Sequence, residues 1–387
     1  MDRSDFDIMR IGYDARYLSH GIFGGVHTYV KLLVPAMIEH ARDHDIFVYA
    51  DTKRSFELDA NAFPKNVTLR LLPYRNALSS ILNDVTLQRQ MEADKIEVAH
   101  FPANVGFAPK GTKAVVTLHD AINIMPLVEI LRGHQKKLRT MTMMTYLHWM
   151  STETVRRAQM LLTVSNEAKR TISKYTPFQP ERIVAVTNGP DPKFKRIEDP
   201  ALLNEVRTRY NLQQPFVLAD GLKNPGVLTR AWKLLTPEVR DAHRIVFFSR
   251  RPDPPQTVLD AVSASQAHLL VRPSTEDLIA LYSLAQAFIF PSWIEGLGLP
   301  LLEAMHCGAP VIASDRGSIP EVAGDAALFT DAEDENTLAQ HITRVLTDAG
   351  ARADMRMRGY ARAATFTWPK TAERVMEAYR QAMTIAS

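Results

Sequence analysis

The stretch that decides the fold is FIFPSWIEGLGLPLLEAMHCGAPVIASD, residues 288–315. An apolar run typical of a buried strand precedes Glu295, and a run with helical spacing contains Glu303. Between the glutamates, Gly296 and Gly298 offer backbone N–H groups to an anion at the expected start of this helix. We expect Glu303 in the first helical turn, where it can accept a hydrogen bond from a ribose hydroxyl. Carboxylates can bind hydroxyl groups, and backbone amides can bind phosphate. The two together fit a nucleotide-sugar.

The residues alone leave two other interpretations of this pair open. In the first, Glu303 only complements the helix dipole and Glu295 is a surface acid. In the second, the two carboxylates flank a glycosidic bond, as in glycosidases, where they are about 5–5.5 Å or about 6.5–9.5 Å apart. Both glutamates follow one strand, however, and a hydrolase does not need the glycine-rich loop between them. A diphosphate explains that loop.

Outward from this stretch, apolar runs alternate with helical patterns along the whole chain. Strands are expected at 8–14, 46–50, 67–72, 97–101, 113–118, 160–165, 216–220, 244–249, 268–272, 287–292, 310–314 and 326–330. Continuous β-branched runs separated by helices predict an α/β fold with parallel sheets. We expect two halves, 1–178 and 179–368, and a C-terminal helix, 369–387, that returns to the first half. Ligands bind beyond the carboxyl ends of such strands.

Length and composition limit the classes of protein. The 387 residues are too many for one ordinary core, and the net charge of +3 does not indicate nucleic-acid binding. Cys307 is the one cysteine, which excludes an intrachain disulfide. The N-terminal sequence does not read as a signal peptide, and no run approaches the roughly 18 apolar residues of a membrane span. We expect a cytoplasmic protein.

Basic residues are concentrated in the stretch 132–182. It contains ten Lys or Arg against three acids, Glu153, Glu167 and Glu181. In its first part, basic residues stand beside Met, Tyr146 and Trp149, a combination that suits the surface of an anionic membrane. The alternative is a packed helix with a solvated charged face. If the first interpretation holds, the protein lies at the inner face of the cell membrane.

The segment FIFPSWIEGLGLPLLEAMHCGAPVIASDRGSIPEVAGDAALF, residues 288–329, resembles the donor-site signature of glycosyltransferase family 4, which has the GT-B fold. Glu295 and Glu303 match its two glutamates separated by seven residues. Other family patterns follow in order: GGVHTYV, TLHD, LLTVSNEAKR, VTNGPDPKF and FTWPKTA. The resemblance therefore spans nearly the whole chain. It implies two Rossmann-like domains facing across a cleft, with the donor bound mainly by the second and the acceptor by the first.

The resemblance also implies an activity. The chain is similar to bacterial mannosyl- and rhamnosyltransferases of surface polysaccharide synthesis. It implies a retaining hexosyltransferase that moves a sugar, with GDP-mannose favoured as donor, to a hydroxyl of a glycan or a lipid-linked acceptor. The family's usual explanation is a front-face reaction in which the leaving phosphate takes the acceptor's proton. The alternatives are an epimerase or phosphorylase of the same fold, or a weakly active nucleotide-sugar-binding protein.

Two motifs in the first half supply further site residues. GIFGGVHTYV, residues 21–30, places Gly24 and Gly25 between a strand and a helix, where glycine permits close approach of the backbone to a ligand. In the family this loop contacts the donor phosphate and the reacting sugar. The alternative is an ordinary glycine loop that binds no ligand. VVTLHD ends a strand with His119 and Asp120. The family's histidine lies against the donor sugar, whereas a structural cap is the alternative.

The loop FVLADGLKNPGVL contains Lys223, which matches a family lysine that meets the diphosphate. The family arginine expected beside it is missing, because Leu222 follows Gly221. A leaving diphosphate needs cationic or dipolar stabilisation. Arg250 or Arg251 can substitute, or the amides after Glu295 carry more of the charge.

The expected donor-binding residues are Gly24, Gly25, Lys223, Glu295, Gly296, Leu297, Gly298, Leu299 and Glu303; the expected catalytic residues are His119, Lys223 and Glu295; and further candidates are Asp120, Asn188 and Arg250. No metal or other cofactor is expected. Asp43 and Asp45 form a D-x-D motif, but it precedes its strand and therefore lies at the wrong end of the sheet. No Cys/His cluster has zinc spacing.

Overall fold

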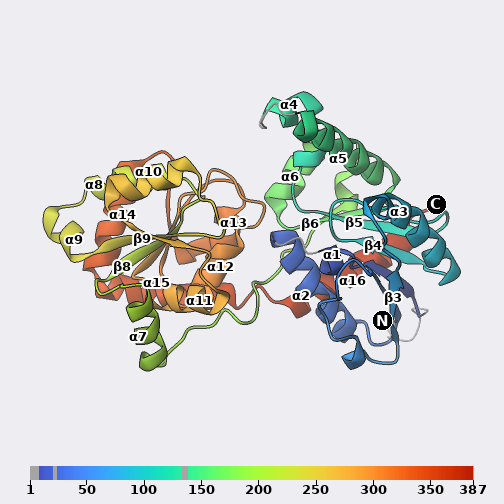
Figure 1. Ribbon diagram of the computed structural model, residues 1–387, viewed down its shortest axis with the longest axis horizontal. Coiled ribbons are helices and arrows are strands. Elements are labelled where there is room, and N and C mark those ends of the chain that lie inside the picture. Colours follow the sequence, from blue (N-terminus) through green and yellow to red (C-terminus); the bar gives the residue numbers. More distant parts are fainter. Residues whose placement is uncertain (1–7, 21–23, 133–137, 387) are drawn as a thin grey trace. The chain divides into compact units, whose positions relative to one another are not determined.

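The computed structural model describes residues 8–20, 24–132 and 138–386 (Figure 1). The chain forms two compact units. The first consists of Met1–Asn188 and Trp368–Ser387, and the second is Gly189–Thr367. Residues 21–23 of the glycine loop and Lys136 and Lys137 of the basic stretch lie outside the described residues.

The first unit is a parallel sheet covered by helices. Its strands are β1 (Arg10–Asp14), β2 (Asp45–Asp51), β3 (Val67–Leu72), β4 (Val98–Phe101), β5 (Lys113–Leu118), β6 (Met160–Thr163) and β7 (Ile183–Ala185). Its α-helices are α1 (Tyr17–His20), α2 (Gly25–His40), α3 (Ala77–Ala93), α4 (Leu127–Arg132), α5 (Leu138–Arg157), α6 (Asn166–Tyr175) and α16 (Trp368–Thr384). Short 3-10 turns are η1 (Ala60–Ala62), η2 (Ile122–Ile124) and η3 (Pro180–Arg182).

The strand order of this sheet, among the described residues, is β3-β2-β1-β4-β5-β6-β7, and every neighbouring pair is parallel. In a parallel sheet all strands end at the same edge, so the loops after β1 and β5 belong to one edge. The order turns back between β1 and β4, and this is the point where open α/β sheets bind their ligands.

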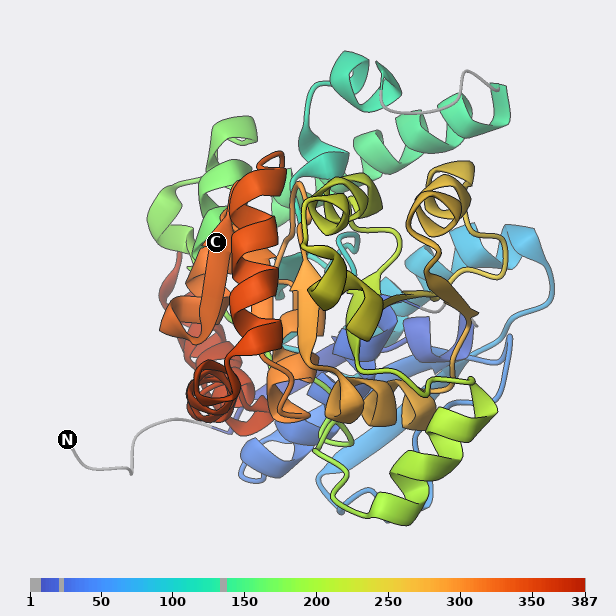
Figure 2. The same cartoon turned by 90° about the vertical axis from the view of Figure 1, so that its left-hand side faces the viewer.

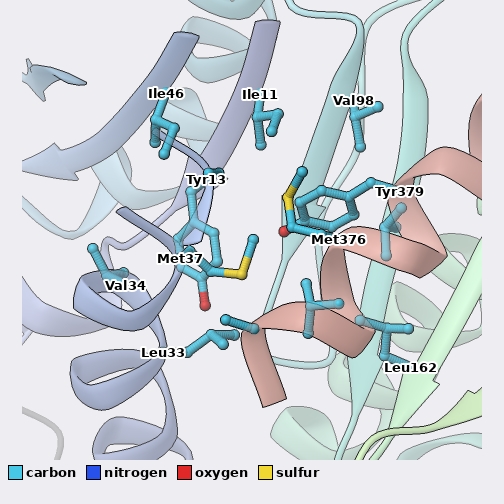
Figure 3. Close-up of a cluster of buried hydrophobic side chains, with 14 of the residues drawn as sticks. Ile11, Tyr13, Leu33, Val34, Met37, Ile46, Val98, Leu162, Met376 and Tyr379 are labelled. Carbon is cyan, nitrogen blue, oxygen red and sulfur yellow. The ribbon is translucent and has the colours of Figure 1, made fainter. Parts of the chain in front are cut away.

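The C-terminal helix α16 completes the core of the first unit. Figure 3 shows Met376 and Tyr379 of α16 in one apolar cluster with strand residues such as Ile11 and Val98. The hydroxyl of Tyr379 lies 2.7 Å from Nδ1 of His100 on β4. Helix α16 is therefore part of this unit although it lies about 180 residues away from β7 in the chain.

The second unit is a six-stranded parallel sheet in the described residues, ordered β10-β9-β8-β11-β12-β13. Its strands are β8 (Phe216–Asp220), β9 (Arg244–Ser249), β10 (His268–Val271), β11 (Ala287–Phe290), β12 (Val311–Ser314) and β13 (Ala327–Thr330). Its helices are α7 (Pro200–Arg209), α8 (Pro225–Lys233), α9 (Pro237–Ala242), α10 (Gln256–Ser265), α11 (Thr275–Leu284), α12 (Leu299–His306), α13 (Ile319–Ala323), α14 (Glu335–Thr347) and α15 (Ala349–Ala363), with a 3-10 turn η4 (Gly324–Ala326).

Local sequence explains why several of these helices begin where they do. Ser274 Oγ accepts a hydrogen bond from Asp277 N at the start of α11, and Asp334 Oδ1 accepts one from Asn336 N at the start of α14. Helix α7, lime green in Figure 2, lies at the margin of the unit, as it does in Figure 1. It is tied to α11 because Arg209 and Tyr210 both bind the carboxylate of Asp277.

The division between the units lies later than the boundary that we expected at residue 178. Strand β7 is the reason, because Ile183 pairs with Leu161 of β6 in the first sheet. The sequence pattern restarts at this run, and we therefore assigned it to the second half. Periodicity identifies a strand but does not say which sheet it joins.

Candidate functional site

Glycines at the carboxyl edge of the first sheet leave the start of α2 open. Gly24 is the N-cap of α2 and has φ +146°, which an L-residue with a side chain rarely adopts. A Cβ atom at Gly24 or at Gly25 would meet nothing within 4 Å. Among the described residues, the space beside the N-cap and the first residue of this 16-residue helix is therefore open. This is the geometry that a phosphate or sugar needs to approach the backbone.

His119 follows β5 at the same edge, and its ring is held in place. Its Nε2 lies 2.9 Å from the carbonyl oxygen of Pro102, so Nε2 carries the proton and donates it. The ring also packs edge-on against Tyr29, with centroids 4.9 Å apart. Burial lowers the pKa of His119, which keeps the imidazole neutral. In this tautomer Nδ1 is an acceptor, suited to receive a hydrogen bond from a hydroxyl group.

The other two candidates of the first unit have different surroundings. Asp120 is exposed, and its Oδ1 accepts the backbone N–H of Ile122 at 2.8 Å, which fixes the turn after β5. Asn188 is buried, with 2% of its surface exposed, at the point where the chain leaves the unit.

The expected residues of the second unit meet in ion pairs at the carboxyl edge of its sheet. Lys223, which follows β8, places Nζ 2.7 Å from Oε1 of Glu295, which follows β11. Ser292 Oγ donates to the same oxygen at 2.7 Å. Gly317 packs against the backbone of Glu295, since a Cβ there would lie 3.1 Å from Glu295 N. The structure thus brings Lys223 and Glu295 together. The Glu295 carboxylate is held by Lys223 and Ser292, and its main chain is held by close packing against Gly317.

Glu303 is buried and forms a second ion pair. Its Oε2 lies 2.8 Å from Nη2 of Arg250, which follows β9, and Tyr282 OH donates to the same oxygen at 3.5 Å. Only 8% of the Glu303 side chain is exposed, whereas 52% of the Arg250 side chain is exposed. Burial raises the pKa of Glu303, and the Arg250 charge opposes that shift. Our expectation that Glu303 lies in the first helical turn was wrong: α12 begins at Leu299, so Glu303 is its fifth residue and faces inward.

The start of α12 lies between these two pairs. Gly298 is its N-cap with φ +84°, a left-handed conformation that favours glycine. Leu297 is buried, whereas Gly296 and Leu299 are partly exposed. The buried Leu297 side chain therefore anchors the loop, and the left-handed backbone of Gly298 allows the turn into α12. The N-terminus of α12 lies at the same sheet edge as Lys223 and Arg250, which suits a phosphate.

Asp220 is a residue of this cluster that our sequence analysis missed. It ends β8, is 6% exposed, and its Oδ1 accepts the N–H of Leu222 at 2.9 Å. Burial raises its pKa, while the charges of Lys223 and Arg250 lower it. The available signal was an aspartate ending an otherwise apolar strand, FVLAD. The cluster has three carboxylates and two cations, so one negative charge is left over when all are ionised.

Four of the described cations of the basic stretch 132–182 have local partners. Arg156 and Arg157 both pair with Glu153. Arg170 pairs with Glu167, and Arg182 donates to the carbonyl oxygens of Ala158 and Gln159. The side chains of Arg132 and Arg139 are not among those described. The described cations of this stretch therefore do not form one unpaired patch.

Metal ligands do not gather in the parts of the chain that the structure describes. No group of three or more His, Cys, Asp or Glu side chains there is arranged to hold an ion. Asp45 begins β2 and pairs with Arg10 at 3.2 Å, so the D-x-D motif lies at the amino end of its strand. In the same described part, no helix combines the length and apolar character needed to cross a membrane.

A cavity lies elsewhere on the second unit. A cavity of about 500 Å³ is lined by Lys233, Arg240 and Arg244, near the amino end of β9. Lys233 ends α8, and Arg240 lies in the last turn of α9. Cations at these positions complement the negative ends of helix dipoles, which explains them without a ligand.

Comparisons with known proteins agree with this architecture. The description Glycosyltransferase Family 4 matches residues 23–194, and Glycosyl transferases group 1 matches residues 218–348. O-antigen chain mannosyltransferase B of Escherichia coli is 32% identical over 277 residues, which cover 69% of this chain and 70% of that protein. Serotype-specific mannosyltransferase WbdA of Escherichia coli is 28% identical over 234 residues, 58% of this chain but 29% of that longer protein.

Solved structures share the fold at low sequence identity. WaaG, a glycosyltransferase involved in lipopolysaccharide biosynthesis, has a TM-score of 0.65 at 17% identity, covering 96% of this chain and 99% of that one. Anabaena Alr3699/HepE in complex with UDP-glucose has a TM-score of 0.68 at 15% identity, covering 96% and 100%.

Two Rossmann-like units with parallel sheets are the architecture of the GT-B class of glycosyltransferases. Within that class the chain belongs to glycosyltransferase family 4. It is therefore an enzyme, a hexosyltransferase of glycan synthesis. The family, the GT-B fold and the enzyme class that the sequence resemblance implied are therefore confirmed.

Proposed function

We propose that the protein transfers a hexose, with retention of configuration and without a metal ion, from a nucleotide-sugar bound by the second unit. The observation that carries this is the cluster at the carboxyl edge of the second sheet, where two cations and two glutamates meet beside the start of α12. A diphosphate takes the cations and the amides of α12. The sugar hydroxyls then face Glu295, and the ribose hydroxyls face Glu303.

The reaction proceeds by attack of an acceptor hydroxyl on the anomeric carbon. As the new C–O bond forms, the bond to the diphosphate oxygen breaks, and the leaving phosphate takes the proton from the acceptor oxygen. No side chain of the cluster is placed as a nucleophile in this scheme. The protein contributes by positioning the reactants and by stabilising the growing charge on the leaving group. His119 and the glycine loop of the first unit act on the sugar and the acceptor side.

Mannose is the favoured sugar, with GDP-mannose as donor. The support is the 32% identity to a protein named as a mannosyltransferase over more than two thirds of both chains. A thermal-shift screen with UDP, GDP and their hexoses tests the donor. Ligand at 100 times its dissociation constant stabilises the folded protein by about 2.7 kcal/mol. Stabilisation by GDP and GDP-mannose alone is the expected result, and stabilisation by UDP-glucose instead would contradict the choice of donor.

The acceptor belongs to a glycan under synthesis and is lipid-linked. The support lies in the first unit, where α5 carries an apolar outer face that includes Leu138, Met141, Tyr146 and Trp149, all exposed. Thr142 on the same face donates its hydroxyl to the carbonyl of Leu138, so it presents a methyl group outward.

Charge favours an anionic membrane as the surface that covers this face. Residues 130–152 include four Lys or Arg and no Asp or Glu. An anionic lipid surface complements a segment of this composition. Helices α4 and α5 lie at the margin of the first unit in Figure 1. Docking there places the enzyme at the inner face of the membrane, where a lipid-linked acceptor is available.

Vesicle sedimentation over a salt series tests this contact. The protein should sediment with anionic vesicles at low salt, and less so as the Debye length falls from about 30 Å at 0.01 M to about 8 Å at 0.15 M. Trp149→Glu should reduce binding, because it puts a carboxylate into the apolar face. Met357→Glu, at an exposed apolar residue of α15, is the matched control. A protein that stays in the supernatant with anionic vesicles at low salt would rule the contact out.

A further inference from the structure

Each cation of the donor cluster is held by a carboxylate in the free protein. Lys223 pairs with Glu295, and Arg250 pairs with Glu303. We propose that Arg250 is a diphosphate-binding residue and that Glu303 holds its guanidinium only until the diphosphate binds. The inference rests on the proposed donor site and adds to it a residue and a switch of partner.

Exposure separates the roles of the two partners. Half of the Arg250 side chain is exposed, while the Glu303 carboxylate lies beneath it among Tyr282 and the core of α12. Within the described residues, the Arg250 guanidinium donates only from Nη2. Its remaining N–H groups are available for the paired oxygens of a phosphate, which a guanidinium binds in a fork geometry. The arginine can therefore turn toward a ligand, and the buried carboxylate cannot follow it.

Sheet order places Arg250 beside the lysine that the same ligand needs. Strand β9 neighbours β8 in the sheet, and both run in the same direction. Lys223 follows β8 and Arg250 follows β9, so the two side chains leave neighbouring strands at one edge. Neighbouring strands lie about 4.8 Å apart, a spacing that side chains bridge to reach both phosphates of one diphosphate. The charges of both Lys223 and Arg250 lower the pKa of Asp220 at the end of β8, which agrees with their positions at this edge.

The residue next to Lys223 increases the need for a second cation. Leu222 is 38% exposed and uncharged, so the loop after β8 offers one cation where the diphosphate carries at least two negative charges. Arg251, the neighbour of Arg250, pairs instead with Asp253 at 3.4 Å and is itself exposed. Among the cations that follow β8 and β9, Arg250 alone is paired with a buried carboxylate of the cluster.

The exchange also explains how Glu303 becomes ready for the ribose. While Arg250 is its partner, the carboxylate is neutralised and hydrogen-bonded. When Arg250 turns to the diphosphate, Glu303 keeps its burial but loses its counter-charge, which favours hydrogen bonds from two ribose hydroxyls in its place. Diphosphate and ribose therefore bind cooperatively, because each part of the ligand replaces one partner of the same ion pair.

Calorimetry with GDP, GMP, UDP and UMP on the full chain tests the proposal. Arg250→Ala should weaken diphosphate binding by at least about tenfold, since a hydrogen bond between charged groups is lost, and should affect the monophosphates far less. Arg251→Ala is the matched control and should change neither. Adding Leu222→Arg to Arg250→Ala should restore much of the diphosphate affinity, because it supplies a cation on the adjacent loop.

Loss of Arg250 leaves the buried Glu303 carboxylate unpaired, which can prevent folding. The double variant Arg250→Ala/Glu303→Gln removes both charges, and it should still bind diphosphates at least about tenfold more weakly than Glu303→Gln alone.

Two results would overturn the role of Arg250. One is equal diphosphate affinity of Arg250→Ala/Glu303→Gln and Glu303→Gln, and the other is an equal loss of affinity for mono- and diphosphates in Arg250→Ala. If the unaltered protein binds no nucleoside diphosphate, the proposed donor site itself fails, and this inference fails with it.

Discussion

At the residue scale, the second unit solves a problem of unpaired charge. A site for a diphosphate needs cations, and a site for sugar and ribose hydroxyls needs carboxylates. Both kinds of group would be costly if they were partly buried and unpaired. In the free protein they pair with each other, Lys223 with Glu295 and Arg250 with Glu303. In the proposed donor site, the diphosphate exchanges these partners rather than filling an electrostatically empty cavity.

Lys223 is predicted to stabilise the leaving group. Lys223→Ala should lower kcat at least about tenfold, because the growing charge on the diphosphate loses a charge-assisted contact worth roughly 1.5–3 kcal/mol. Lys223→Arg should restore part of the rate. Lys233→Ala, at the other end of α8, is the matched control. The measurement is steady-state transfer from the donor identified in the screen, and near-normal turnover of Lys223→Ala would exclude this role.

Glu295 and Glu303 are predicted to bind different parts of the donor, Glu295 the sugar and Glu303 the ribose. Glu295→Gln should weaken the nucleotide-sugar more than the nucleoside diphosphate, because Glu295 faces the sugar. Glu303→Ala should weaken both, since the ribose is common to them, by roughly 1.5–3 kcal/mol. Calorimetry with the diphosphate and with a nonreactive nucleotide-sugar measures both. Unchanged diphosphate affinity in Glu303→Ala would contradict the assignment of Glu303 to the ribose.

At the element scale, helix starts and strand ends position the chemistry. Gly24 and Gly298 cap α2 and α12 with positive φ, so each helix begins directly after a tight turn at the carboxyl edge of its sheet. Helix α12 carries Glu303, which pairs with Arg250, while the loop before it carries Glu295, which pairs with Lys223. One helix start thus directs two glutamates that are eight positions apart in sequence to two different cations.

His100 is predicted to make the attachment of α16 pH-dependent. It is fully buried between Thr117 and Tyr379, and burial together with His119 lowers its pKa to about 3. The unfolded state takes up a proton near pH 6.5, so stability is complete above that pH and falls as the pH drops toward 3. The expected slope is about 1.4 kcal/mol per pH unit. Hydrogen exchange of α16 amides at several pH values, corrected for intrinsic rates, measures it.

Tyr379→Phe separates this titration from simple packing. It removes the hydroxyl next to His100 Nδ1 but keeps the imidazole, so it should lower stability by about 1 kcal/mol and preserve the slope. His100→Gln should remove this contribution to the slope, because the imidazole that titrates is gone. A slope that persists unchanged in His100→Gln would assign the effect to another group.

At the scale of the whole molecule, the chain crosses between its units twice, after Asn188 and before Trp368. The second unit is continuous in sequence and has its own apolar core of residues from β8, β9, α8 and α14. The first unit depends on α16 from the far end of the chain. The units therefore differ in what they need in order to fold.

The excised segment 189–367 is predicted to fold and to bind the nucleoside diphosphate. Lys223, Arg250, Glu295 and Glu303 all lie within it, so its affinity should be within about tenfold of that of the full chain. A second truncation, residues 1–367, lacks α16 and should therefore expose the apolar core that α16 covers, including Ile11 and Val98, and aggregate. Circular dichroism and calorimetry on both fragments check this. A folded second unit that binds no diphosphate would show that the donor site needs the first unit.

Periodicity and motif spacing by themselves determined much of this protein. They predicted the α/β class, the parallel sheets and the two halves, because strands and helices follow local patterns of apolar residues. They also placed Lys223 and His119 correctly at the ends of their strands. The family resemblance followed from short contiguous motifs, which can be recognised in the sequence without knowledge of the fold.

Only the tertiary structure decided which groups face each other. The sequence does not join β7 to the first sheet, bury Asp220, or pair Arg250 with a glutamate 53 positions later. These facts depend on strand order and on which side of α12 faces the core, and both are set by long-range packing. Local patterns specify which residues end a strand, whereas the charge that each of them meets is fixed only when neighbouring strands come together.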